Sequence, residues 1–233
     1  MPGGDPYFAN VVLLMHFDGD YTDKSQYAQA FTSVGATLSA TGAKFTQSVK
    51  INAPSGGGGT NAVNSDSSIS GYELTPGDYT VEAWAKISSS LETGVQSGIL
   101  SINQPGFGVT RGGILLSFAG RAAGNVIRFA YGASFSSIIM TSEAASVYAT
   151  NGIWYHIAVT RSSDTYRLFV NGVLVATVVS SDTYPQNARY VAVGNNYGFT
   201  SGLDGYVDEV RVTKGVARYT ANFTPPAAPF QNS

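Results

Sequence analysis

One stretch, from Trp154 to Val179, constrains the fold more than any other because it has the pattern of two strands joined by a tight turn. Its sequence is WYHIAVTRSSDTYRLFVNGVLVATVV, in which β-branched and aromatic runs flank Asn171-Gly172. An Asn-Gly pair between alternating apolar runs favours a β-hairpin, since both turn positions need positive φ. We therefore expect a hairpin here, with at least half of its flanking apolar residues buried: Leu168, Val170, Val173 and Val175.

Short runs of the same kind recur along the chain, and turn residues separate them. No segment shows a sustained apolar period of 3.6 residues, so helices are not expected between the strands. Many short strands without intervening helices predict an all-β fold, a two-sheet antiparallel β-sandwich of the jelly-roll type. The expected strands are Val11 to Phe17, Tyr79 to Ile87, Gly98 to Ile102, Ile114 to Ala119, Val126 to Tyr131, Ser136 to Thr141, Trp154 to Thr160, Tyr166 to Val170, Leu174 to Val179, Tyr190 to Val193 and Tyr206 to Val212.

Composition narrows the classes of partner. A net charge of −2 provides no attraction for nucleic acid or for an anionic membrane surface, and we expect neither as a partner. The absence of cysteine excludes disulfides and thiolate metal sites. No apolar run approaches the roughly 18 residues of a spanning helix. We expect residues 1–233 to form one domain, with an N-terminal arm (1–10) and an extended C-terminal tail (220–233).

The segment from Pro54 to Pro76 contains four consecutive glycines and almost no periodicity. This composition predicts a long surface loop at the rim of the sandwich. The prolines near the C-terminus favour an extended tail that lies on the sandwich.

The strand from Tyr79 to Lys86 alternates so that Thr80, Glu82, Trp84 and Lys86 share one face. Trp84 therefore lies among polar neighbours. Its ring is a candidate ligand-binding surface, on which a sugar ring would stack. The alternative, which aromatic side chains more often adopt, is packing beneath a loop.

Four blocks together resemble the laminin-G-like, concanavalin A-like lectin/glucanase jelly-roll family from about Val11 to Phe230. They are VVLLMHFDG, YTVEAWAKI, the Trp154 to Val179 hairpin and LDGYVDEVRVTKGVARYTANFTPP. The last block is most similar to modules of bacteriophage virion proteins. The resemblance implies a fold that mostly binds sugars or protein surfaces, with hydrolysis confined to some branches.

The resemblance also implies a Ca²⁺ ion bridging the turn at Asp18 and Gly19 to the closing strand at Asp208. Calcium takes six to eight oxygen ligands, and carboxylates and carbonyls in such turns supply them. In the alternative interpretation, Asp18 and Asp23 cap their own backbone turns and Asp208 pairs with a nearby arginine.

The residues give little support for catalysis. The glucanase branch carries Glu-x-Asp-x-x-Glu on one strand, and no such motif is present. Glu82 is alone on its strand, and alternation places Asp208 and Glu209 on opposite faces. His16 and His156 are expected to be hydrogen-bonded structural residues. We therefore expect that the protein is not an enzyme.

These observations favour a non-enzymatic structural or adhesion protein of a bacteriophage particle. Its expected partners are capsid or tail proteins and a host cell-surface glycan, and linked copies in a homo-oligomer would raise avidity. The first apolar run has neither a basic segment before it nor a cleavage site after it, which is consistent with assembly into a virion without a signal peptide. The alternatives are a free carbohydrate-binding lectin and, less favoured, a glycoside hydrolase.

Overall fold

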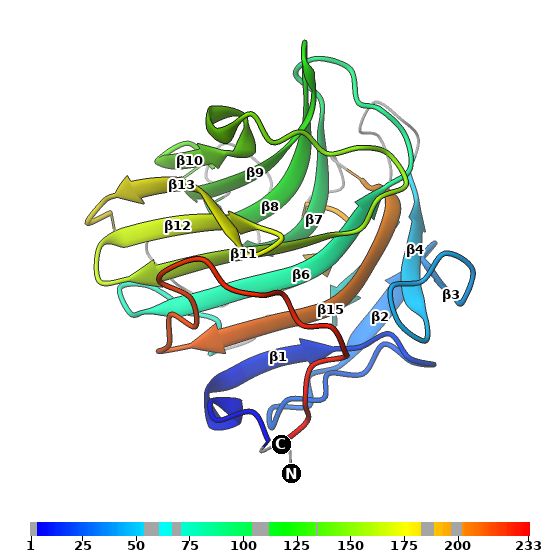
Figure 1. Cartoon of the computed structure of the whole chain (residues 1–233). Helices are drawn as coiled ribbons and strands as arrows, with labels where there is room; N and C mark the ends of the chain where they lie inside the picture. The colour runs from blue at the N-terminus through cyan, green and yellow to red at the C-terminus, as the bar shows by residue number, and fades with distance from the viewer. Residues whose placement is uncertain are drawn as a thin grey trace.

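Two antiparallel β-sheets pack face to face in the computed structural model of the chain (Figure 1). The structure describes residues 4–53, 61–66, 71–103, 112–133, 135–182, 189–196 and 202–233. Within these ranges the helices are the two short 3₁₀ turns η1 (Phe8–Asn10) and η2 (Ser142–Ala145), and neither is long or apolar enough to cross a membrane. The expected all-β sandwich is confirmed.

The first sheet is eight-stranded in the described residues, and we call it sheet A. Its order is β13 (Val173–Val179), β12 (Thr165–Val170), β11 (Tyr155–Ser162), β6 (Tyr79–Ile87), β15 (Asp204–Lys214), β4 (Ser48–Asn52) and β3 (Thr37–Ser39), and β1 (Val11–Met15) also pairs with β15. Sheet B runs β10 (Ile138–Thr141), β9 (Gly124–Ala133), β8 (Gly112–Arg121), β7 (Gln96–Asn103), β14 (Tyr190–Val193), β5 (Ala62–Ser65) and β2 (Phe31–Val34).

The predicted hairpin joins β12 to β13. Asn171 and Gly172 have φ angles of 48° and 78°, as the turn requires. Three of the four flanking residues named above are buried, and only Val173 is exposed, which confirms the expectation. Gly172 has a second role, because an added Cβ would lie 1.9 Å from the carbonyl oxygen of Phe223 in the C-terminal tail.

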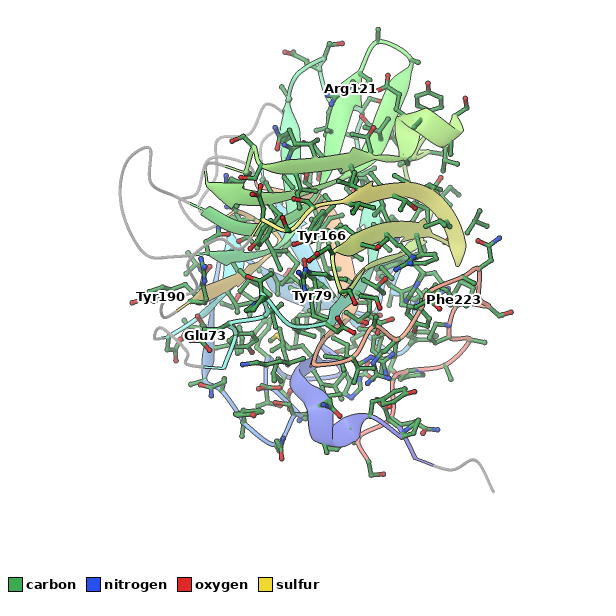
Figure 2. The ribbon with its side chains drawn as sticks, turned by 90° about the vertical axis from the view of Figure 1, so that its left-hand side faces the viewer. Glu73, Tyr79, Arg121, Tyr166, Tyr190 and Phe223 are labelled. Atoms are coloured by element: carbon green, nitrogen blue, oxygen red, sulfur yellow. The ribbon has the colours of Figure 1, made fainter. Side chains whose placement is uncertain are left out.

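The core fills the space between the sheets. The inward residues of β6, among them Val81 and Ala83, belong to one large apolar cluster that draws on both sheets. The rings of Tyr79 and Tyr166 meet edge to face in this interior with centroids 6.3 Å apart, whereas Phe223 lies over the outside of sheet A (Figures 1 and 2). The outward residues of β6 are buried as well, so something covers the outer face of sheet A.

That cover is the chain's own ends. The C-terminal tail crosses the outer face of sheet A, and both termini meet at one edge of the molecule (Figure 1). Tyr219 and Phe223 stack with ring centroids 3.5 Å apart, and Phe230 packs on Val11 and Leu14 of β1. The C-terminal tail therefore lies on the outer face of the sandwich.

The expected surface loop from Pro54 to Pro76 is wrong in part. Residues 62–65 form strand β5, which pairs with β14 and β2 inside sheet B. Ala62 and Val63 are fully buried, and the polar residues Asn64 and Ser65 that follow them conceal the strand pattern. Residues 54–60 and 67–70 lie outside the described residues, so the glycine run carries no structural statement.

Candidate functional site

Strand register arranges the outer face of sheet A in transverse rows. In one row, Tyr206 of β15 lies opposite Lys86 of β6 on one side and Lys50 of β4 on the other. Trp154, directly before β11, continues the row, because the next residue along pairs with the neighbour of Lys86. We call these four residues, Trp154, Lys86, Tyr206 and Lys50, the aromatic–lysine row.

The ammonium groups in this row lie against the aromatic rings. Lys86 Nζ is 4.9 Å from the ring centroid of Trp154 and 4.3 Å from that of Tyr206. Lys50 Nζ is 5.9 Å from the same tyrosine ring, and the Trp154 and Tyr206 centroids are 6.4 Å apart. These distances suit cation–π attraction. Lys86 is buried, while the other three side chains are half-buried and keep part of their surface open to solvent.

The loop between β3 and β4, residues 40–47, is attached to this row. Its Gly42 carbonyl accepts hydrogen bonds from Trp154 Nε1, at 3.2 Å, and from Lys86 Nζ. Gly42 has a φ of 74° and is itself exposed. The loop therefore fixes the orientation of both side chains.

Trp84, the ligand-binding residue predicted from the sequence, lies beneath this loop. Lys44 Nζ is 3.7 Å from its ring centroid, and Phe45 meets it edge to face at 6.3 Å. Only 7% of Trp84 is exposed. Trp84 thus packs beneath the loop, and a sugar would reach its ring only if Lys44 and Phe45 moved away.

The lysines around the row lack carboxylate partners. Among the ion pairs of the described residues, none includes Lys44, Lys50 or Lys86. Burial lowers the pKa of Lys44 and of Lys86, although the charge of Asp208 opposes this effect on Lys44. The surface is therefore positively charged on a protein whose net charge is negative.

Asp208 lies in the next row, opposite Trp84. Its carboxylate accepts hydrogen bonds from the Ser48 hydroxyl at 2.8 Å, the Glu209 N–H at 2.9 Å and the Phe45 N–H at 3.4 Å. Burial raises the pKa of Asp208 to about 7, with a further contribution from the charge of Glu209. The expected pairing of Asp208 with an arginine, the alternative to calcium, is not what the structure has.

The structure gives the calcium prediction little support. Asp18 accepts a hydrogen bond from the Gln47 N–H at 2.9 Å, and Asp208 is occupied by the three donors above. Gly19 follows Asp18 with a φ of 100°. Within the described ranges, no three His, Cys, Asp or Glu residues lie close enough to hold a metal ion. These residues do not fit an ion that needs six to eight oxygens, and calcium stays a prediction.

Asp23, by contrast, has the structural role anticipated for it. Its carboxylate accepts hydrogen bonds from the N–H groups of Leu14, Ser25 and Gln29, which hold the turn after β1.

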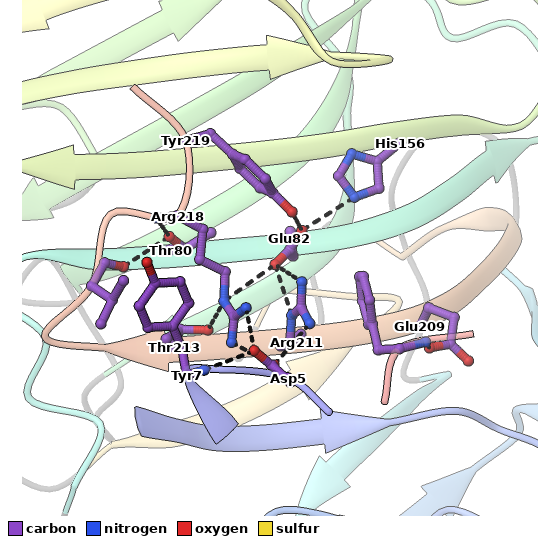
Figure 3. A network of polar contacts seen from close by, with 12 residues as sticks. Asp5, Tyr7, Thr80, Glu82, His156, Glu209, Arg211, Thr213, Arg218 and Tyr219 are labelled. Atoms are coloured by element: carbon purple, nitrogen blue, oxygen red, sulfur yellow. Dashed lines mark hydrogen bonds and ion pairs between the residues drawn. The ribbon is translucent and has the colours of Figure 1, made fainter. Parts of the chain in front are cut away.

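Glu82 lies at the centre of a buried network beneath the tail (Figure 3). Arg211 binds one carboxylate oxygen with both Nε and Nη2 at 2.8 Å, and the Tyr219 hydroxyl donates to the other at 3.0 Å. His156 Nε2 lies 3.2 Å from Glu82. Burial alone would raise the pKa of Glu82, but the Arg211 charge and the contacts with His156 outweigh it and lower the pKa to about 2.

The same network holds both ends of the chain. Asp5 of the N-terminal arm accepts hydrogen bonds from Arg218 at 2.7 and 2.9 Å and from Arg211 at 3.2 Å (Figure 3). A pocket of about 380 Å³ lies between arm and tail, with Asp5 and Arg211 in its lining. Because those two charges already neutralise each other, the pocket offers no free charge to a ligand.

The expectation that Asp208 and Glu209 point to opposite faces is wrong. A β-bulge interrupts the pairing of β15 with β6 between Asp208 and Arg211, and Glu209 has a φ of 48°. Both carboxylates therefore lie outside the core, between the core residues Val207 and Val210.

Glu209 connects the first strand region to the tail. It binds His16 Nδ1 at 2.8 Å and accepts the Phe230 N–H at 2.7 Å. His16 is a hydrogen-bonded structural residue, as expected. His156 is fully buried and lies 3.2 Å from Glu82, but neither of its ring nitrogens forms a regular hydrogen bond within the described residues.

Chemically, this face is suited to binding. In the aromatic–lysine row, Trp154, Tyr206 and Lys50 keep part of their surface open to solvent, whereas Glu82 and Asp208 have no exposed surface. Of the row, sequence reasoning identified only the position of Lys86, on the face of Trp84. The alternation that placed those two residues together also places Tyr206 and Asp208 on one face of their strand. Tyr206 could have been identified from this pattern.

Comparison with known proteins gives a family and a fold. The family model of the concanavalin A-like lectin/glucanases superfamily matches residues 55–218, well over half of the chain. No curated protein matches the sequence.

Solved structures share the fold at low identity. The binding domain of Paraclostridial Mosquitocidal Protein 1 has a TM-score of 0.65 at 13% identity over 91% of this chain and 50% of that one. Domain 4 of AbnA, an extracellular arabinanase from Geobacillus stearothermophilus, in complex with arabinotriose, has a TM-score of 0.62 at 15% identity over 88% of this chain and 93% of that one. The ligand binding domain of botulinum neurotoxin serotype D, in complex with N-acetylneuraminic acid, has a TM-score of 0.63 at 13% identity over 91% of this chain and 49% of that one. The chain thus spans about half the length of the two toxin domains.

Proposed function

Since the chain belongs to the concanavalin A-like lectin/glucanases superfamily, we propose that it is a module that binds carbohydrate without cleaving it, through the aromatic–lysine row. Two of the structures with this fold were solved with a sugar, arabinotriose in one and N-acetylneuraminic acid in the other. The family and these likenesses support a role in binding.

The observation that carries the proposal is the pair of half-buried rings, Trp154 and Tyr206, fixed 6.4 Å apart on the outer face of sheet A. Rigid aromatic side chains present a large contact area at little cost in conformational entropy. The Gly42 carbonyl holds the indole in place, so binding does not have to pay for ordering it.

The buried carboxylates support a non-catalytic role. A glycosidase needs an acid with a raised pKa and a second carboxylate about 5 to 9.5 Å away, both reaching the sugar. Glu82 has its pKa lowered to about 2 by Arg211, against the effect of burial, and is fully covered. Asp208 has a suitable pKa but is equally covered and bonded to three protein donors.

A glycan array followed by calorimetry tests the proposal. We expect binding of at least one glycan, and Trp154→Ala should weaken it at least tenfold. Ile153→Ala is the matched control, because the neighbouring Ile153 is 50% exposed and has no part in the row. Equal loss in both variants, or no glycan bound at all, would contradict the proposal, as would turnover of any glycan.

For the setting of this activity, we propose an adhesion component of a bacteriophage particle that presents several copies. The closing block LDGYVDEVRVTKGVARYTANFTPP, similar to that of phage virion modules, supports it. Linked copies raise avidity by about 10² to 10⁴ over one shallow site. Peptides of this chain should appear in a mass-spectrometric inventory of purified particles, and their absence would refute the setting while leaving glycan binding intact.

A further inference from the structure

We propose that the aromatic–lysine row recognises an acidic glycan, one whose sugar carries a carboxylate. This inference rests on the proposed function and names the ligand class of the same surface. The inference is based on the lysine ammonium groups around the row, which a neutral sugar would leave without a negatively charged partner.

Three ammonium groups gather on this surface although lysine is rare in the chain. Lys44, Lys50 and Lys86 lie there, and the remaining lysines, Lys24 and Lys214, are each paired with a carboxylate elsewhere. Positive charge thus concentrates where the described structure offers it no ion pair. Ligand carboxylates are the complement that such a surface lacks.

Burial makes this arrangement costly. Lys86 is only 8% exposed, and its contacts are one carbonyl oxygen and two aromatic rings. A buried, charged ammonium group without a carboxylate partner is less stable than the same group in water. The lowered pKa of Lys86, caused by burial, reports this cost. An anionic ligand would offset it at the moment of binding.

The nearby carboxylates do not neutralise the row. Asp208 faces Lys44 from the next row, but burial raises its pKa to about 7, so near neutral pH its charge is partial. Asp204, two residues before Tyr206 on the same strand face, accepts a hydrogen bond from the Ser89 hydroxyl at 2.7 Å. The positive charges outnumber these two groups.

The spacing of the row suits a sugar lying on Tyr206. Lys86 and Lys50 lie on the strands either side of β15, so their backbones are about 10 Å apart. Both ammonium groups lie over the Tyr206 ring, 4.3 and 5.9 Å from its centroid, so an acidic sugar bound against this ring would meet them.

Two matched ligand pairs test the inference by calorimetry. Trigalacturonic acid is compared with its methyl ester, which differs in the charge of the carboxylates. Sialyllactose is compared with lactose, which lacks the acidic sugar. We expect the acid to bind at least tenfold tighter in one pair at low salt, since a charge-assisted hydrogen bond is worth about that much. The preference should shrink as salt rises.

The variants Lys50→Met and Lys86→Met should weaken binding of the acid by a larger factor than binding of the neutral partner, so that the preference for the acid is lost. Lys214→Met, at a lysine outside the row, should leave both affinities unchanged. Thermal melting shows whether each variant folds. If Lys86→Met does not fold, Lys50→Met alone is sufficient for the test.

Equal affinities for acid and neutral partner would overturn the acidic ligand class while preserving carbohydrate binding. An acid preference that survives both lysine variants would also overturn it. A failure of every acidic and neutral glycan to bind would overturn the proposed function itself.

Discussion

Asp208 should make the protein less stable as the pH rises through neutrality. Burial raises its pKa in the folded state to about 7, against 3.8 for an unperturbed aspartate. Between these values the folded protein holds one proton more than the unfolded chain. The free energy of unfolding therefore falls with pH across this window, because the slope follows the difference in bound protons.

The magnitude follows from the two pKa values. Each pH unit with one extra bound proton costs about 1.4 kcal/mol, and integration from pH 5 to pH 8 gives a loss of about 2 to 3 kcal/mol. For a chain of 233 residues this lowers the melting temperature by about 5 to 10 °C.

The assay is thermal unfolding followed by circular dichroism at pH 5, 6, 7 and 8, for the parent and for Asp208→Asn. The amide keeps an acceptor for the Glu209 N–H and presents a donor to the Ser48 hydroxyl. The variant should lack this part of the pH dependence and should gain stability relative to the parent as the pH rises.

His16 changes stability in the same direction, so it needs its own control. Burial would lower its pKa, but the hydrogen bonds to Glu209 and Asn232 outweigh burial and raise it. Stability from a raised histidine pKa is present at low pH and is lost as the pH rises through the folded pKa. His16→Asn measures that share. If parent and Asp208→Asn gave parallel curves from pH 5 to 8, the reasoning on Asp208 would be refuted.

Three further perturbations test the fold and the metal prediction. Gly172→Ala should destabilise by about 2 kcal/mol or more in urea unfolding, because it combines a φ of 78° with a Cβ 1.9 Å from the Phe223 carbonyl oxygen; Gly152→Ala, with a φ of 76° and open space, should cost less. Glu82→Gln should cost about 3 to 5 kcal/mol by leaving Arg211 buried with a weakened partner, whereas Glu73→Gln, which breaks a surface pair, should cost under about 1 kcal/mol. Bound calcium would add about 2.7 kcal/mol at a hundredfold excess over its Kd, yet with Asp208 occupied by protein donors we expect EDTA to leave the melting temperature unchanged; a fall that added calcium reverses would establish the ion.

The strands with clear alternation were predictable. β6 and the β11 to β13 unit carry long runs of β-branched and aromatic residues, and the turn at Asn171 fixes their register. The four strands between Phe31 and Ser65 were missed, because they are three to five residues long and rich in polar side chains. β4, with the sequence SVKIN, shows only Val49 and Ile51 as an alternating pair.

The sequence predicted which face of the strand carries the candidate site, but not which side chains on that face are covered. Alternation placed Trp84 and Lys86 together, but what covers a face comes from distant parts of the chain. The loop at Gly42 buries Trp84 and leaves Trp154 partly open, and no local pattern distinguishes these two tryptophans. The bulge at Glu209 is likewise invisible in the sequence, since the residue there is not a glycine.

The position of β15 within sheet A has a consequence for the order of events during synthesis. This strand lies between β6 on one side and β1 and β4 on the other, yet it begins only at Asp204. A nascent chain that has not yet reached β15 holds three parts of sheet A that cannot join, namely the β13 to β6 unit, the β4 and β3 pair, and β1, and each part has an unpaired strand edge. Folding of sheet A must therefore wait until β15 has left the ribosome, and a messenger truncated before this strand would yield an aggregation-prone product rather than a smaller working module.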